Sequence, residues 1–229
     1  MRLGEETLKS NTLGIEFPRM SQIVGVGDIA LKVECIADLD QAIDILFVEY
    51  EKSGRTELFE ELCPYFGQVW PASLGLAEVV LREASEWKNA RVLEVGCGLA
   101  IPSLALAKTG VEVHAMDLHP DVPIYLEKNT ALNDICSLRY SHGDWRKQKD
   151  ALPWQKILAS DVLYDRSQPE EMISFLERST TKDAEVIVSD PGRVYFGRFL
   201  MLAKSRGWEV EEGMEGDVFI ARLRGGPRV

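Results

Sequence analysis

The stretch from Ala90 to Ser103 reads Ala-Arg-Val-Leu-Glu-Val-Gly-Cys-Gly-Leu-Ala-Ile-Pro-Ser. Its first part, Arg91 to Val95, is a short β-prone run that breaks at Gly96–Gly98, and Pro102 then opens a segment rich in alanine and leucine. Proline suits a first helical position because its φ is preset and its missing N–H would have no partner there. The stretch therefore predicts a strand, a tight glycine turn and a helix, the first unit of a nucleotide-binding α/β sheet.

The two glycines of this turn, Gly96 and Gly98, permit positive φ and let backbone amides approach a ligand closely. Their spacing, Gly-x-Gly-x-Ala, differs from the Gly-x-Gly-x-x-Gly of dinucleotide sites. Glu94, just before the turn, would repel a pyrophosphate but suits a ligand that carries an ammonium or sulfonium group. A glycine pair alone is weak evidence, since many strand–helix turns contain glycine for geometry alone.

The next predicted strand, Val111–Asp117, alternates in hydropathy, ends in an acid and is followed by Leu118. Asp117 lies about 20 residues beyond the glycine turn, which is the spacing at which an acid accepts ribose hydroxyls. A strand-end aspartate that caps the next helix is the alternative. With the glycine turn upstream, we favour the ribose contact.

Acidic residues outnumber basic ones 37 to 26, which gives a formal net charge of −11. A negative field favours cationic partners and makes nucleic acid an unlikely one. The sequence has no apolar run near the length of a membrane span and no hydrophobic leader at its N-terminus. Its four cysteines, Cys35, Cys63, Cys97 and Cys136, are scattered, which predicts reduced thiols in a cytoplasmic protein and neither a metal site nor a disulfide framework.

The order of predicted elements indicates the architecture. A loose arm to about Gly27, a strand at Asp28–Ile36 and a helix at Leu39–Glu51 come first. Predicted strands and helices then alternate, and two last strands, Trp208–Glu212 and Val218–Leu223, close the sheet as an antiparallel pair. This alternation predicts a doubly wound, mostly parallel α/β sheet.

Several short motifs resemble those of a known family. Glu94–Gly98, Asp117 and Gly143-Asp144-Trp145 are similar to the successive motifs of class I S-adenosylmethionine-dependent methyltransferases. Val69-Trp70-Pro71-Ala72-Ser73 and Asp161-Val162-Leu163-Tyr164 resemble the Trp-Pro and Asp-x-x-Tyr signatures of the methyltransferase family 16 group, which is rich in protein-lysine methyltransferases. Ser189–Arg193 is similar to a segment of the electron-transfer flavoprotein β-subunit lysine methyltransferases within that group. The resemblance covers roughly Pro64 to the C-terminus.

The resemblance implies a seven-stranded, Rossmann-like methyltransferase fold over residues 61–229. From the predicted N-terminal strand and helix, we expect residues 1–60 to form an extension packed on this domain. It also implies S-adenosyl-L-methionine as cofactor and a protein bearing a lysine as partner. The residues expected to contact the cofactor are Trp70, Glu94, Gly96, Gly98, Asp117, Leu118, Asp144, Trp145 and Asp161.

Trp70 and the Asp144-Trp145 pair each have two interpretations. Most tryptophans pack in the core, but the family pattern favours Trp70 as a wall beside the sulfonium, where a π-face attracts a cation. Asp144 would accept a hydrogen bond from the adenine amine, with Trp145 packed on the ring. An ordinary Gly-Asp turn remains the alternative.

Asp161 and Tyr164 are the predicted catalytic residues. A lysine amine must be neutral to react, and with a pKa near 10.4 this costs roughly 4–5 kcal/mol at pH 7. Asp161 would recruit and orient the amine but also hold it charged, which the nearby sulfonium opposes. Tyr164 would shape the channel. The alternatives are a helix cap for Asp161 and a half-buried core ring for Tyr164.

Asp190 and Arg193 are the predicted substrate-binding residues. Asp190-Pro191-Gly192-Arg193 predicts a rigid turn, because proline fixes φ and glycine permits a sharp reversal. Arg193 would then pair with an acidic residue beside the target lysine. Arg193 as the neutraliser of a neighbouring acid within the chain is equally consistent with the sequence.

Two other functions remain open at this stage. A small-molecule N- or O-methyltransferase would use the same fold, because the fold does not fix the substrate. A catalytically silent binding module is the second, and the intact glycine turn and Asp117 disfavour it.

Overall fold

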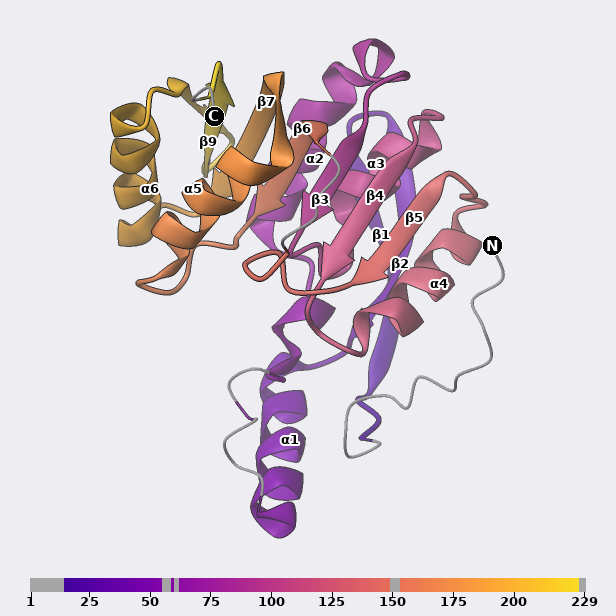
Figure 1. Ribbon diagram of the computed structural model, residues 1–229. Coiled ribbons are helices and arrows are strands. Elements are labelled where there is room, and N and C mark those ends of the chain that lie inside the picture. Colours follow the sequence, from indigo (N-terminus) through magenta and orange to yellow (C-terminus); the bar gives the residue numbers. More distant parts are fainter. Residues whose placement is uncertain (1–14, 55–58, 60–61, 149–152, 227–229) are drawn as a thin grey trace.

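The computed structural model describes residues 15–54, 59, 62–148 and 153–226. Its centre is a seven-stranded sheet with the order β5-β4-β3-β6-β7-β9-β8 (Figure 1). The parallel strands are β3 (Val92–Val95), β4 (Val113–Asp117), β5 (Leu138–His142), β6 (Trp154–Ser160) and β7 (Thr180–Asp190). The predicted doubly wound, mostly parallel sheet is therefore confirmed.

The last two strands form the predicted antiparallel pair. β8 (Glu209–Glu215) and β9 (Val218–Arg224) form a hairpin, and β9 inserts between β8 and β7, antiparallel to both. Ala221 and Leu223 of β9 are fully buried, whereas β8 is mostly exposed. The more apolar strand of the hairpin therefore takes the inner place and the acidic strand forms the edge.

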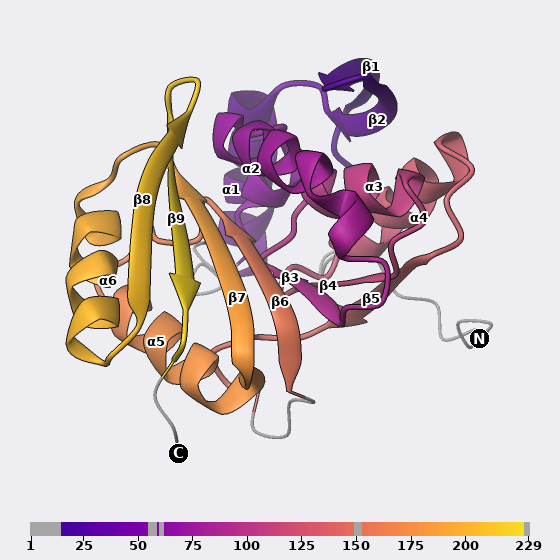
Figure 2. The same cartoon turned by 90° about the horizontal axis from the view of Figure 1, so that it is seen from above.

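Helices cover both faces of the sheet (Figure 2). One face carries α2 (Pro71–Arg82), α3 (Ile101–Lys108) and α4 (Val122–Leu132), and the other carries α5 (Gln168–Ser179) and α6 (Val194–Ser205). All residues of α3 before Lys108 are buried, because α3 lies between the sheet and other elements. Among the described residues, no helix is long and apolar enough to span a membrane.

The N-terminal part holds a hairpin, β1 (Arg19–Val26) and β2 (Ile29–Ile36), followed by α1 (Leu39–Ser53). Asp38 caps α1 by accepting a hydrogen bond from the backbone of Gln41, and Gly54 ends it with φ of 68°. The strand and the helix were predicted, but the prediction of a loose arm was wrong for residues 19–26, which form β1. Only Val24 and Val26 of this strand are buried, so its apolar pattern is short. Residues 1–14 of the expected loose arm lie outside the described residues.

The hairpin is attached to the core by Asn129 of α4 and by Asn133, which directly follows that helix. Asn133 exchanges two hydrogen bonds with the backbone of Lys32 (2.9 and 2.7 Å), and Asn129 exchanges two with the backbone of Glu34 (2.7 and 3.1 Å). Side chains four residues apart on a helix are spaced like alternate residues of a strand. The two buried amides therefore continue the ladder of β2 onto α4.

The topology fixes where a ligand can bind. The chain runs outward from β3 through β4 to β5, and then returns to place β6 on the other side of β3. Open α/β sheets bind ligands outside the carboxyl ends of their strands at such a reversal. The glycine turn follows β3, and Asp161 follows β6, so the predicted site residues meet at this point.

Candidate active site

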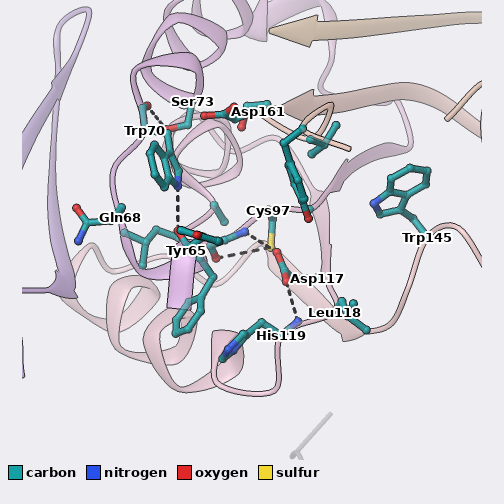
Figure 3. Close-up of a pocket in the computed structure, with 18 of the residues that line it drawn as sticks. Tyr65, Gln68, Trp70, Ser73, Cys97, Asp117, Leu118, His119, Trp145 and Asp161 are labelled. Atoms are coloured by element: carbon teal, nitrogen blue, oxygen red, sulfur yellow. Dashed lines mark hydrogen bonds between the residues drawn. The ribbon is translucent and has the colours of Figure 1, made fainter. Parts of the chain in front are cut away.

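A cavity of about 410 Å³ opens at the carboxyl ends of β3, β4 and β6 (Figure 3). It is lined by the turns that follow these strands, by the turns after β5 and β7, and by the segment from Cys63 to Ser73. That segment contains a short 3-10 helix, η2 (Pro64–Gly67). Of the predicted site residues, the cavity is lined by Trp70, Gly96, Gly98, Asp117, Leu118, Asp144, Trp145, Asp161, Tyr164 and Arg193, and not by Glu94 or Asp190.

The glycine turn is shaped by close neighbours. Gly96 and Gly98 have φ of 60° and 50°. A Cβ at Gly96 would lie 2.7 Å from the side chain of Val162, and one at Gly98 would lie 2.9 Å from the carbonyl oxygen of Phe66. Only glycine therefore lets the turn pass between the β6 loop and η2. Ala100, where related turns carry a third glycine, is also left-handed with φ of 56°.

Asp117 joins the glycine turn to the end of β4. Its Oδ2 accepts from the backbone N–H of Gly98 (2.8 Å), and its Oδ1 accepts from that of His119 (2.8 Å). Burial raises the pKa of this carboxyl group. Each oxygen can accept a second hydrogen bond, so a carboxylate in this place still has acceptor capacity toward the cavity.

Glu94 was expected to face the ligand, and the structure does not bring it to the cavity. Its side chain is fully buried beneath the first turn of α3, where Oε2 accepts from both the backbone N–H and the hydroxyl of Ser103. Burial raises its pKa to about 8. Alternation along β3 directs this side chain toward α3, so Glu94 supports the turn from behind.

Trp70 lines the cavity and is half-buried, so it is not a core residue. Its indole Nε1 donates to the carbonyl oxygen of Tyr65 (2.9 Å), and the two rings lie 6.5 Å apart (Figure 3). α2 begins directly after it at Pro71. Trp70 therefore presents an aromatic ring at the cavity wall, and its contact with the sulfonium stays a prediction.

Asp144 and Trp145 were predicted to contact the cofactor, and in the structure both also make contacts with other residues of the protein. Asp144 accepts from the backbone and from the guanidinium of Arg146 at 2.7–3.0 Å. Trp145 is buried, and its ring makes an edge contact of 5.7 Å with Phe175 of α5. Figure 3 shows Trp145 apart from the other labelled residues. Its indole is part of the core beneath α5, although it reaches the cavity wall.

Asp161 and Arg193 form an ion pair at the cavity wall. Asp161 has φ of 59°, which is unusual for a residue with a side chain, and the guanidinium of Arg193 bonds its Oδ1. Arg193 therefore neutralises an acid of its own chain, which was the alternative to pairing with a substrate acid.

Asp190 does not line the cavity. It is fully buried, and its Oδ1 accepts from the backbone N–H groups of Gly192 (2.7 Å) and Arg193 (2.6 Å). Asp190 therefore holds the turn that presents Arg193, and it is not available to a substrate. Tyr164 is 64% exposed at the mouth of the cavity, so it is not a half-buried core ring.

Residues of η2 and its surroundings were missed as site residues. His119 accepts from the backbone of Asp121 through Nδ1 (3.1 Å), so its Nε2 carries the proton and donates to the carbonyl of Leu62 (3.1 Å). Burial lowers its pKa to about 4, and its ring packs 4.1 Å from that of Phe66. This neutral histidine fixes η2 over the glycine turn. In the sequence, its place directly after Leu118, a predicted cofactor contact, was the one feature that pointed to His119 as a site residue.

Metal ligation finds no support in the described part of the chain, where no three potential ligand side chains gather. The polar and aromatic groups of the cavity are instead backbone amides, the three carboxylates of Asp117, Asp144 and Asp161, and aromatic rings. Such a set suits an organic ligand with hydroxyl groups and positive charge.

Comparisons with known proteins agree with this geometry. A protein-family model described as lysine methyltransferase matches residues 60–195. An electron transfer flavoprotein beta subunit lysine methyltransferase of Danio rerio is 29% identical over 135 residues, which cover 58% of this chain and 52% of the relative. A histone-arginine methyltransferase of Xenopus laevis is 30% identical over 131 residues, 54% of this chain and 56% of the relative.

Among solved structures, the 16S rRNA N2 G1207 methyltransferase of T. Thermophilus has a TM-score of 0.62 at 13% identity and covers 93% of this chain and 52% of its own. At that identity the likeness shows the fold alone. The chain spans about half the length of the curated relatives it matches. Because the family model covers more than half of the sequence, the chain belongs to the lysine methyltransferase family.

Proposed function

We propose that this protein is an S-adenosylmethionine-dependent methyltransferase that methylates a lysine side chain of a protein. The observation that carries the proposal is the cavity at the strand-order reversal, where the glycine turn, Asp117 and Asp161 meet. The names of the relatives, which act on lysine and arginine of proteins, support a protein substrate.

The residues present fit the cofactor. The cavity, at about 410 Å³, has the size of an ordinary small-molecule site. Asp117 would accept the ribose hydroxyls, Leu118 would pack on the adenine, and the half-buried ring of Trp70 would face the sulfonium. The cofactor supplies a methyl group on a positively charged sulfur, which leaves as a neutral thioether.

Asp161 and Tyr164 would receive the acceptor. The neutral lysine nitrogen forms a bond to the methyl carbon, the carbon–sulfur bond breaks with its electron pair left on sulfur, and the surplus proton on nitrogen passes to water. The reaction needs the nitrogen in line with the breaking bond at about 3–3.5 Å. We assign that placement to Asp161 on the cavity wall and to the exposed ring of Tyr164 at its mouth.

The domain organisation, the cellular location and the kind of partner are also part of the proposal. We infer that residues 1–60 form an extension on a methyltransferase domain at 61–229, which the contacts of Asn129 and Asn133 with β2 support. We also infer a cytoplasmic location, since all four cysteines are free thiols and three are buried. The net charge of −11 favours a cationic protein partner over nucleic acid.

The proposal is tested by binding and by transfer. Calorimetry with S-adenosylmethionine should show binding by the wild type and at least about a tenfold loss for Asp117→Asn, because hydrogen bonds to a charged acceptor are worth roughly 1.5–3 kcal/mol. Asp183→Asn, an exposed aspartate near the start of β7, is the matched control and should bind normally.

Incubation with methyl-labelled cofactor and a cell lysate then identifies the acceptor. Label should enter protein and be recovered as methyl-lysine after hydrolysis. Label found only in small molecules would favour the alternative methyltransferase. Absence of cofactor binding by the wild type would leave only a silent module.

A further inference from the structure

The ion pair between Asp161 and Arg193 bears on the acceptor amine, and the inference drawn from it rests on the proposed function. The guanidinium of Arg193 bonds Oδ1 of Asp161 and lies 3.6 Å from Oδ2 of Asp190. The side chain of Asp161 is 10% exposed and that of Arg193 is 35% exposed, and both line the cavity. Within the described part of the chain, no group donates to Oδ2 of Asp161.

A lone carboxylate at this place would hinder the reaction it serves. A carboxylate within about 4–6 Å of an ammonium favours the charged form and raises the pKa of the amine. The charged amine has no lone pair for the methyl carbon. A lone Asp161 would therefore bind the target lysine firmly in its unreactive state.

Arg193 changes this balance because its guanidinium stays protonated at every working pH. Paired with Asp161, it offsets most of the negative charge that an incoming amine meets, while Oδ2 remains to accept a hydrogen bond from that amine. We propose that Arg193 is a positioning residue that keeps the target amine in its neutral, nucleophilic form by neutralising Asp161.

The structure holds the guanidinium in this place firmly. Asp190 accepts from the backbone N–H groups of Gly192 and Arg193 and so fixes the turn at the start of α6. A Cβ at Gly192, whose φ is 101°, would lie 2.8 Å from the ring of Phe219, so β9 packs directly on this turn. Arg193 is thus presented to Asp161 by the fold and does not depend on a chance surface contact.

The other charged groups near the cavity have partners of their own or are buried, so they do not neutralise Asp161. Asp117 accepts two backbone N–H groups, and Asp144 is paired with Arg146 and with Lys147 at 3.3 Å. Asp190 is buried behind the turn.

The remaining titratable groups of the cavity wall are uncharged near neutral pH. Burial raises the pKa of Cys63 and Cys97, and a hydrogen bond with Cys63 raises the pKa of Tyr65. The exposed Tyr164 is a phenol, which ordinarily ionises only near pH 10. Burial lowers the pKa of His119 to about 4. Arg193 is therefore the cation that faces Asp161.

The test is the pH dependence of the single-turnover rate at saturating substrate, measured with a lysine peptide identified by labelling. This rate reports ionisations in the bound complex. Arg193→Gln should shift the rising limb of the pH–rate profile to higher pH by about one unit, which lowers the rate at pH 7 about tenfold. The KM for the peptide should fall, because the charged ammonium binds better to an unpaired Asp161. Raising the pH should restore the rate.

Three further variants separate charge from structure. Arg193→Lys keeps the positive charge and should leave the limb in place. Asp161→Asn leaves Arg193 uncompensated and should move the limb to lower pH with a higher KM. Arg206→Gln is the control: it breaks an ion pair with Glu177 at the end of α6 (3.1 Å) and should change neither the pH of the rising limb nor KM.

The position of the limb does not depend on how much enzyme is folded, so loss of stability alone cannot produce the shift. An unmoved limb in Arg193→Gln, or in Asp161→Asn if the first variant does not fold, would overturn the inference. If the wild type transfers no methyl group to lysine, the proposed function fails instead.

Discussion

Glu94 is a single buried residue that makes the stability of the folded protein depend on pH. Its carboxyl group is enclosed beneath α3, Oε1 has no hydrogen-bond partner within the described residues, and burial raises its pKa to about 8. The folded protein therefore retains a proton that the unfolded chain releases above about pH 4.3. Because the folded state binds this proton more tightly, the contribution of Glu94 to stability declines as pH rises from about 4 to 8.

Replacement of this residue should remove that decline. Glu94→Gln keeps the shape of the protonated side chain, so its free energy of unfolding should stay near the wild-type value at pH 5 and exceed it at pH 9. Urea denaturation at both pH values measures the difference, and each pKa unit is worth about 1.4 kcal/mol. Glu86→Gln, at an exposed glutamate, is the control. A difference between Glu94→Gln and wild type that does not change with pH would contradict the titration of Glu94.

At the scale of elements, the attachment of the β1–β2 hairpin depends on α4. Asn129 and Asn133 are buried, and each pairs with both the N–H and the C=O of one residue of β2. Polar groups at the edge of a strand must find partners when they are covered. The two amides therefore join the two-stranded sheet to α4, which covers one face of the seven-stranded sheet.

Asn133→Asp should weaken this joint, because a carboxylate oxygen would face the carbonyl of Lys32 in place of the donated N–H. We expect a loss of about 1–3 kcal/mol in the free energy of unfolding. Hydrogen exchange at the amides of Lys32 and Glu34 should accelerate, while amides of β3 and β4 keep their protection relative to global stability. Glu127→Gln, exposed on the same helix, should do neither. Unchanged exchange in Asn133→Asp would show that apolar packing alone attaches the hairpin.

The whole molecule carries a net charge of −11, and this bears on how it meets a substrate. A negative field accelerates association with cationic partners, and salt screens it over a Debye length of about 10 Å at 0.1 M. Buried contacts at the cavity are screened much less. Recognition at long range and chemistry at the cavity should therefore respond differently to salt.

Two peptides that differ only in the residues beside the target lysine separate these effects. For the peptide with basic flanks, kcat/KM should fall severalfold between about 50 and 500 mM salt, whereas kcat changes little. For the peptide with uncharged flanks, both should stay nearly constant. Equal salt dependence for both peptides would show that the overall charge does not guide the substrate.

Local sequence determined the alternation of strands and helices, the glycine turn after β3 and the acid at the end of β4. These features depend on neighbouring residues: hydropathy period fixes the element type, and only glycine fits where a positive φ coincides with a close neighbour. The cavity accordingly contains ten of the residues that the sequence singled out.

Only the tertiary structure decided which side chains face that cavity. Glu94 points beneath α3, Asp190 holds a turn, and Arg193 pairs with Asp161, 32 residues away in the chain. β1 and the inner place of β9 were likewise set by packing. The physical reason is that the charge and spacing of a residue are local properties, whereas the direction of its side chain depends on strands and turns that meet only in the folded molecule.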